Sequence, residues 1–345
     1  MDISREIREK VGRLFVIRPE SLDPALSWDS DAELPAYGLA TVNDRMRSFA
    51  ADYPAGGVLL YGHNIKDPEQ LKAFIKDLKS LPGAPLLYID EEGGRVSRIS
   101  RNPAFDVPRF ESAAQLSRSG NPENVRRAGR AIGGYLRSFG IDVDFAPVAD
   151  VNTNPANIII GDRAFSDDPA KAAPMVAAWL KGLQEAGVTG CLKHFPGHGD
   201  TREDTHTGFA ASAKTWEEMA ACEMQTFRAG IAAGARMVMT AHIAAPAVTG
   251  SDLPATMSPL ILQKLRDELH FDGVIITDAL EMGAVAGRFS PGEAAVMALR
   301  AGADLLLNPA DYRSAFEAVM DAVRSGGLTE EIIDRKLARI QRIHG

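Results

Sequence analysis

Short apolar runs recur along the whole chain, and segments in which apolar residues repeat with helical spacing separate them. Most of the runs are apolar at successive positions, which is typical of strands covered on both faces, by a core on one side and by helices on the other. Eight runs can be read from the sequence, at residues 13–17, 57–61, 86–90, 143–148, 189–194, 237–242, 273–278 and 304–308. Their regular alternation with helical segments predicts parallel strand pairing.

Capping residues mark where several of these helices begin. Five segments place proline at the first helical position directly after an N-cap residue, namely Asp67, Asn121, Asp168, Ser258 and Ser290. Capping-box spacing links Asp67 with Gln70, Thr215 with Glu218, and Ser290 with Glu293. The clearest helices are predicted over 215–233 and 329–343, and another around 40–53 within the long segment after the first strand.

Eight strand and helix units with no residues left over for a second domain predict a closed (β/α)8 barrel, the TIM barrel, as a single domain over residues 1–345. An open doubly wound sheet is the alternative architecture. No Gly-x-Gly-x-x-Gly fingerprint or phosphate-binding loop follows any of the runs, which disfavours the nucleotide-binding versions of that fold.

Composition narrows the classes of partner. A net charge of -8 argues against nucleic acid or an anionic membrane, since binding to either needs clustered Lys and Arg. The amino terminus is not that of a secretory signal, and no apolar run approaches the length of a membrane span. Cys191 and Cys222 lie in apolar patterns without a CxxC pair, so we expect reduced core thiols in a cytoplasmic protein.

Polar residues gather where the predicted strands end, and in a barrel these ends open on one face. The densest group lies in residues 189–206, a strand that turns at Pro196 and Gly197 into a loop with Lys193, His194, His198, Asp200, Asp204 and His206. Asp90 and Asp278 are each the first charge after a buried run. Rigid backbone there suits a nucleophile or a group that binds hydroxyls, although either residue could instead be the N-cap of the next helix.

Several segments of this chain resemble the motifs of glycoside hydrolase family 3, in the family's order and over nearly the whole length. They are residues 90–98 (DEEGGRVSR), 161–169 (GDRAFSDDP), 193–200 (KHFPGHGD), 204–206 (DTH) and 276–282 (ITDALEM). Within the family they are similar to the single-domain, NagZ-type β-N-acetylglucosaminidases. The resemblance implies a retaining exo-enzyme that forms a covalent glycosyl-enzyme, acts on a small carbohydrate, by analogy a peptidoglycan fragment, and uses no cofactor and no metal. No oligomeric state is predicted.

The resemblance also implies a role for each matching residue. Asp278 matches the nucleophile and His206 the acid/base, with Asp204 as its partner, a workable pair because imidazole titrates near neutrality. The positions that hold the sugar's hydroxyls are matched by Asp90, Arg98, Arg163, Lys193 and His194. The chain departs from the usual pattern at Thr205, at 207–210 and at Ala279, which leaves the catalytic atoms in place but alters the surroundings of the aglycone.

Some interpretations stay open at this point. A phosphorylase could use the same residues, because His206 repels phosphate less than a carboxylate would, and a family 3 β-glycosidase of another sugar preference fits the same motifs. A metal-dependent barrel hydrolase is suggested by the histidines but lacks the His-x-His pair on strand one. A non-catalytic sugar-binding relative is disfavoured because both catalytic positions are filled. For individual residues, Arg163 could pair with Asp162 or Asp167, His198 and Asp200 are expected to brace the loop, and His242 could border the site or lie in the core.

Overall fold

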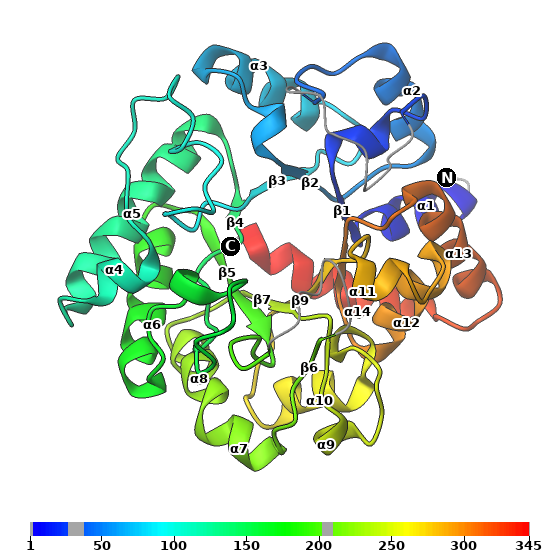
Figure 1. The fold of residues 1–345 in the computed structure, drawn as a ribbon. Helices are drawn as coiled ribbons and strands as arrows, with labels where there is room; N and C mark the ends of the chain where they lie inside the picture. Colours follow the sequence, from blue (N-terminus) through cyan, green and yellow to red (C-terminus); the bar gives the residue numbers. More distant parts are fainter. Residues whose placement is uncertain (1–2, 27–37, 202–209, 345) are drawn as a thin grey trace.

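Eight parallel strands close into a barrel in the computed structural model, which describes residues 3–26, 38–201 and 210–344. Around the ring the strand order is β1-β10-β9-β7-β5-β4-β3-β2 (Figure 1). Their bounds are β1 Phe15–Ile17, β2 Gly57–Leu60, β3 Leu86–Ile89, β4 Val143–Asp144, β5 Thr189–Phe195, β7 Met237–Thr240, β9 Val274–Ala279 and β10 Leu305–Leu307. Each of the eight predicted runs overlaps one of these strands, so the predicted (β/α)8 barrel is confirmed.

Helices form the outer layer of the ring (Figure 1). They are α1 Ile3–Gly12, α2 Asp44–Asp52, α3 Pro68–Lys79, α4 Ala113–Ser117, α5 Pro122–Phe139, α6 Pro169–Glu185, α7 Trp216–Ala221, α8 Glu223–Ala232, α9 Pro246–Thr249, α10 Pro259–Asp267, α11 Gly283–Ala286, α12 Pro291–Ala301, α13 Tyr312–Arg324 and α14 Glu330–Gln341. All five predicted N-caps accept a hydrogen bond from a backbone N–H of the first turn. None of the described helices has both the length and the apolar composition needed to cross a bilayer.

Two details of the helical layer differ from the prediction. The helix expected over 215–233 is two helices, α7 and α8, because Cys222 between them adopts φ −121 and ψ −83. This break lets Glu223 turn inward, where its carboxylate is buried and pairs with Lys214. The predicted capping box at Asp67 is incomplete, since the Gln70 side chain accepts from the backbone N–H of Lys66 instead.

A short parallel pair, β6 (Ala210–Ala211) and β8 (Ile243–Ala244), lies outside the barrel and was not predicted. Each strand has only two residues, too few to show a period-two pattern in the sequence. The pair joins the segment just after residue 209 to the segment that follows β7. It therefore ties the carboxyl side of the β5 loop to the neighbouring strand end.

The barrel interior is filled by apolar side chains, so it is a packed core rather than a channel. The largest contributions come from Tyr88, Phe145, Met237, Met239 and Ile276, and Cys191 lies among them as a free thiol whose pKa is raised by burial. Ile343, after α14, joins this core from the end where the strands begin, and its carbonyl accepts a hydrogen bond from Thr189 Oγ1 at 3.1 Å. The carboxy-terminal segment thus covers one end of the barrel, and the polar residues lie at the other.

Candidate active site

The predicted site residues that the structure describes lie around the carboxyl ends of the strands. Asp90 follows β3, Lys193 and His194 belong to β5, and Asp278 belongs to β9. In the closed strand order β3 and β9 are four strands apart in either direction. Asp90 and Asp278 therefore stand on opposite sides of the barrel mouth, with β5 on one flank between them and β1 on the other.

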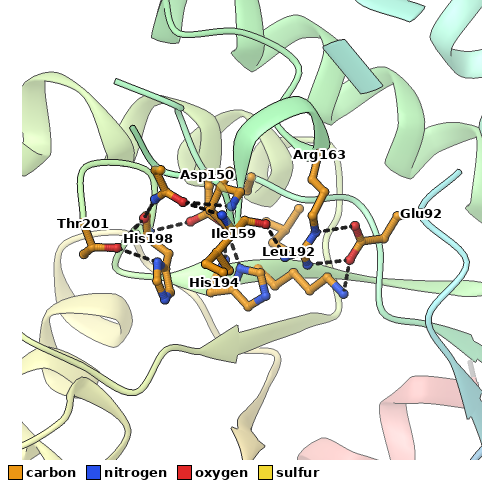
Figure 2. Close-up of polar contacts among 12 residues, drawn as sticks. Glu92, Asp150, Ile159, Arg163, Leu192, His194, His198 and Thr201 are labelled. Carbon is orange, nitrogen blue, oxygen red and sulfur yellow. Dashed lines mark hydrogen bonds and ion pairs between the residues drawn. The ribbon is translucent and has the colours of Figure 1, made fainter. Parts of the chain in front are cut away.

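A buried charged network forms the wall beside β3 and β5 (Figure 2). Lys193 Nζ lies 2.8 Å from Asp90 Oδ1 and 2.6 Å from Glu92 Oε1. Arg163 donates from two of its guanidinium nitrogens to the two Glu92 oxygens, both at 2.8 Å. Arg98 reaches the second Asp90 oxygen at 3.3 Å. Four of the five residues that the resemblance assigns to sugar binding are thus joined in one network, and Glu92 links them.

Ionisation of this network is maintained by its own charges. Burial opposes the charged form of Glu92, but Arg163 and Lys193 outweigh it and lower the pKa of that carboxyl. Burial likewise opposes ionisation of Asp90, and Lys193 and Arg98 reverse the effect and lower its pKa. The pKa of Lys193 is raised because its two carboxylate partners outweigh its own burial. At neutral pH the wall therefore presents fixed charges, which form strong hydrogen bonds to neutral hydroxyls.

Asp150 orients the fifth sugar-binding candidate, His194 (Figure 2). Its Oδ2 lies 2.7 Å from His194 Nδ1 and accepts the backbone N–H of the same residue at 3.2 Å. Its other oxygen accepts the backbone N–H of His198 at 2.6 Å. With Nδ1 held by Asp150, Nε2 is the ring atom that faces away from this anchor. The contacts of His194 and His198 outweigh burial and lower the pKa of Asp150.

Two further residues of the β5 loop brace it, as the sequence predicts. His198 is buried, and its Nδ1 lies 2.7 Å from the Thr201 hydroxyl while its carbonyl accepts from Asn157 Nδ2 at 2.7 Å. Asp200 accepts a hydrogen bond of 2.6 Å from Ser212. These contacts fix the chain on both sides of residues 202–209. Asp204 and His206, the predicted acid/base pair, lie outside the described residues.

The contacts of His242 and Arg163 decide between the alternatives left open for each residue. His242 is fully buried, with Nδ1 2.9 Å from Thr256 Oγ1 and Nε2 2.9 Å from the Ala279 carbonyl, so it is a core histidine that supports the end of β9. The alternative partners considered for Arg163 are wrong. Asp162 pairs with Arg95 at 3.3 Å, and Asp167 accepts a hydrogen bond from Ser166. Arg163 ends a 3-10 turn, and its guanidinium donates to Glu92 instead.

Asp278 is partly buried at the end of β9, and its Oδ1 accepts the backbone N–H of Ala279 at 2.8 Å. Burial is the largest influence on two groups near it, and it lowers the pKa of His198 and raises the pKa of Tyr61. The charge of Asp278 acts to raise the pKa of both groups. Asp278 therefore faces the same space as the β5 loop and the end of β2.

This chain matches the family model described as "Glycosyl hydrolase family 3 N terminal domain" over residues 6–343. The chain belongs to glycoside hydrolase family 3. Among family 3 relatives, it is 34% identical over 332 residues to Beta-hexosaminidase A of Pseudoalteromonas piscicida, covering 88% of this chain and 56% of that protein. It is 32% identical over 330 residues to Beta-hexosaminidase LpqI of Mycobacterium tuberculosis, covering 92% of this chain and 82% of that protein.

Solved family 3 structures share the fold. A family 3 β-N-acetylglucosaminidase from Paenibacillus sp. str. FPU-7 matches with a TM-score of 0.87 and 34% identity, covering 98% of this chain and 62% of that one. The chain thus spans less than two thirds of Beta-hexosaminidase A and of the Paenibacillus protein. The matching part is the barrel, which carries all the site residues named above.

The sequence alone assigns no role to Glu91, Glu92 or Asp150, although all three lie near the carboxyl ends of predicted strands. Glu91 is fully buried and accepts backbone N–H groups from Arg98, Ile99 and Ser100 at 2.6 to 2.9 Å. It therefore shapes the loop that carries Arg98 to Asp90. The position of Glu91 and Glu92 in the sequence could have indicated their importance. Two acids directly after a buried strand and before two glycines need partners once folding buries them.

Proposed function

We propose that this protein is a retaining exo-β-N-acetylglucosaminidase, a β-hexosaminidase that removes terminal β-linked N-acetylglucosamine from small carbohydrates. One observation carries the proposal. Asp278 stands across a single barrel mouth from a buried wall of charged groups that suit sugar hydroxyls, in a chain whose relatives named above are beta-hexosaminidases. A retaining glycosidase needs this pairing of a nucleophilic carboxylate with a rigid subsite that places the anomeric carbon against it.

The proposed reaction has two steps. Asp278 attacks the anomeric carbon as the bond to the leaving oxygen breaks, and His206, oriented by Asp204, gives that oxygen its proton. Water then attacks the glycosyl-enzyme, His206 takes the proton from the water, and the Asp278 carboxylate is released. The roles of His206 and Asp204 rest on the family resemblance and the neutral-range titration of imidazole.

Substrate holding is assigned to the opposite wall. Asp90 can accept hydrogen bonds from hydroxyls while Lys193 and Arg98 keep it ionised. Lys193 and Arg163 can donate to hydroxyls, and Nε2 of His194 can accept from one because Nδ1 donates to Asp150. Each of the three is anchored by a carboxylate, Glu92 or Asp150. Groups fixed in this way lose little freedom when the sugar binds, which favours the productive geometry.

The domain organisation, the natural substrates and the cellular location of the protein are also proposals. We propose that residues 1–345 act as one catalytic barrel, that the natural substrates are peptidoglycan fragments, and that the protein is cytoplasmic. Limited proteolysis tests the first, since a single barrel should yield no stable half. Cleavage of purified muropeptides tests the second, and cell fractionation tests the third.

A panel of aryl β-glycosides tests the activity directly. We expect cleavage of the N-acetylglucosaminide in preference to the glucoside and the xyloside, with no loss of rate after treatment with a chelator. For Asp278→Ala we expect a fall in kcat/KM of at least about a thousandfold, the scale for removal of a catalytic group. Equal activity of the variant would refute the nucleophile. Product analysis in phosphate buffer separates hydrolysis, which we expect, from phosphorolysis, which would release a sugar 1-phosphate.

A further inference from the structure

A tyrosine and an asparagine occupy the flank of the mouth that faces away from Lys193 and His194. Tyr61 directly follows β2, and Asn308 directly follows β10. In the closed strand order β5 lies opposite β1, and β1 lies between β2 and β10. The two residues therefore frame the flank of the mouth that lies opposite Lys193 and His194.

Asn308 is held in place by burial and by hydrogen bonds of its backbone and side chain. It is fully buried at φ 39, its backbone N–H donates to Val16 at 2.8 Å, and its carbonyl accepts from Glu281 at 3.0 Å. Its Nδ2 donates to the Tyr61 hydroxyl at 2.7 Å. Its Oδ1 is buried and has no hydrogen-bond partner among the residues that the structure describes. A buried amide with only one of its two polar atoms hydrogen-bonded lowers stability, and such arrangements are concentrated at functional sites.

The hydrogen bond from Asn308 determines what Tyr61 can offer. Because the phenolic oxygen accepts from Nδ2, the hydroxyl hydrogen is directed elsewhere. The ring rests on the barrel core and stays partly exposed, 5.9 Å from the Arg98 guanidinium and 6.0 Å from that of Arg18. Burial raises the pKa of Tyr61 to about 12, so the phenol keeps its hydrogen at neutral pH. Tyr61 is a neutral donor at the mouth, within electrostatic range of both Asp90 and Asp278.

We propose that Tyr61, positioned by Asn308, is a specificity-determining contact for the C6 hydroxyl of the sugar. The inference rests on the proposed function. A hexopyranose with its anomeric carbon at Asp278 and its far end at Asp90 turns one edge toward β5 and the other toward β1. The C2 to C3 edge has polar substituents on successive carbons, which match the charged wall of β5. The C5 to C6 edge combines C–H surface with one hydroxyl, which matches an aromatic ring with one hydroxyl.

The test pairs a substrate change with a side-chain change. Tyr61→Phe removes one hydroxyl from the protein, and the 6-deoxy form of the aryl β-N-acetylglucosaminide removes one from the sugar. We expect Tyr61→Phe to lower kcat/KM for the parent glycoside by roughly tenfold, the scale of one hydrogen bond to substrate, and to change it by less than about twofold for the 6-deoxy glycoside. Asn308→Asp should reproduce this pattern, because a carboxylate would accept the phenolic hydrogen that the sugar otherwise receives.

Tyr312→Phe is the matched control. The Tyr312 hydroxyl is also buried, but it donates to the Pro54 carbonyl at 2.7 Å and lies on α13 rather than at the mouth. We expect this variant to melt at a lower temperature with an unchanged ratio between the two substrates. An equal loss on both substrates for Tyr61→Phe, or no loss on either, would overturn the inference and leave the proposed function standing. If the wild type instead prefers glucosides, the proposed function fails, and the glucoside with its 6-deoxy form serves as the test pair. Absence of cleavage of every glycoside would overturn both.

Discussion

Glu92 is the residue on which the charged wall depends. Its side chain is 5% exposed and takes two hydrogen bonds from Arg163 and one contact from Lys193. If Glu92 lost its charge, Lys193 would keep its contact with Asp90, whereas Arg163 would lose the carboxylate that it binds. A buried cation that loses its partner is costly because desolvation is no longer offset.

We expect Glu92→Gln to lower the free energy of unfolding at pH 7 by roughly 3–5 kcal/mol, the range for a buried ion pair that loses one partner. Since Arg163 and Lys193 would also shift, KM should rise more than kcat falls. Urea denaturation and steady-state kinetics measure the two effects. Glu123→Gln removes an exposed carboxylate that pairs with Arg126 and should have little effect on either.

The stability difference between wild type and Glu92→Gln should depend on pH in a fixed direction. The pKa of Glu92 is lowered in the folded protein, so its carboxylate stabilises the fold above the unfolded pKa of about 4.3 and loses this effect as pH falls toward the folded value. The difference should therefore be complete at pH 7 and shrink below about pH 4. A difference that grows as the pH falls would contradict this assignment.

The sequence predicts some individual residues of the candidate site and misses others for a physical reason. Asp90 and Asp278 are visible because each ends a buried run, and parallel pairing brings such ends to one face. Glu92 and Tyr61 take their importance from partners far along the chain, Arg163 and Asn308, that only the fold brings near. No local pattern encodes such pairs.

Helices α5 and α6 approach each other closely, and glycine makes the approach possible. A Cβ at Gly182 of α6 would lie 2.2 Å from the Arg126 carbonyl oxygen of α5, and one at Gly129 would lie 2.5 Å from the Trp179 carbonyl oxygen. The contact has a consequence at the mouth. Tyr135 of α5 donates to Glu91 at 2.8 Å, and Glu91 holds the loop that carries Arg98.

We expect Gly182→Ala to lower the free energy of unfolding by about 1–3 kcal/mol through overpacking, although alanine favours helix. Gly134→Ala in α5 is the matched control, because a Cβ there would meet nothing within 4 Å. It should raise stability by roughly 0.5–1 kcal/mol through helix propensity alone. Thermal and urea denaturation measure both, and equal effects of the two substitutions would contradict the close approach.

Element prediction succeeds where local signals agree with the tertiary structure. The five N-cap and proline pairs begin helices as expected, because the cap and the fixed proline φ act within one turn. The continuous pattern over 215–233 hides the break at Cys222, which follows from the inward turn of Glu223 toward Lys214. That contact is a tertiary one, and it overrides helix propensity.

The barrel brings polar residues from segments near positions 90, 163, 193 and 278 to one of its ends, while the segment after α14 covers the other end. This arrangement follows from the alternating strand and helix pattern, since parallel strands in a closed ring must end on the same face. The sequence therefore predicts the architecture and the side of the molecule that carries the site. It cannot predict which flank binds which edge of a substrate, because that depends on strand order and side-chain direction in three dimensions.

The proposed function depends above all on a covalent bond between Asp278 and the sugar. The most direct measurement uses 5-fluoro-β-N-acetylglucosaminyl fluoride, whose ring fluorine slows both steps while the fluoride leaving group speeds the first, so that the glycosyl-enzyme accumulates. Peptide mapping by mass spectrometry should find one added sugar on Asp278, and Asp278→Asn should carry none. An adduct on any other residue, or steady turnover to the inverted sugar with no adduct, would contradict the account.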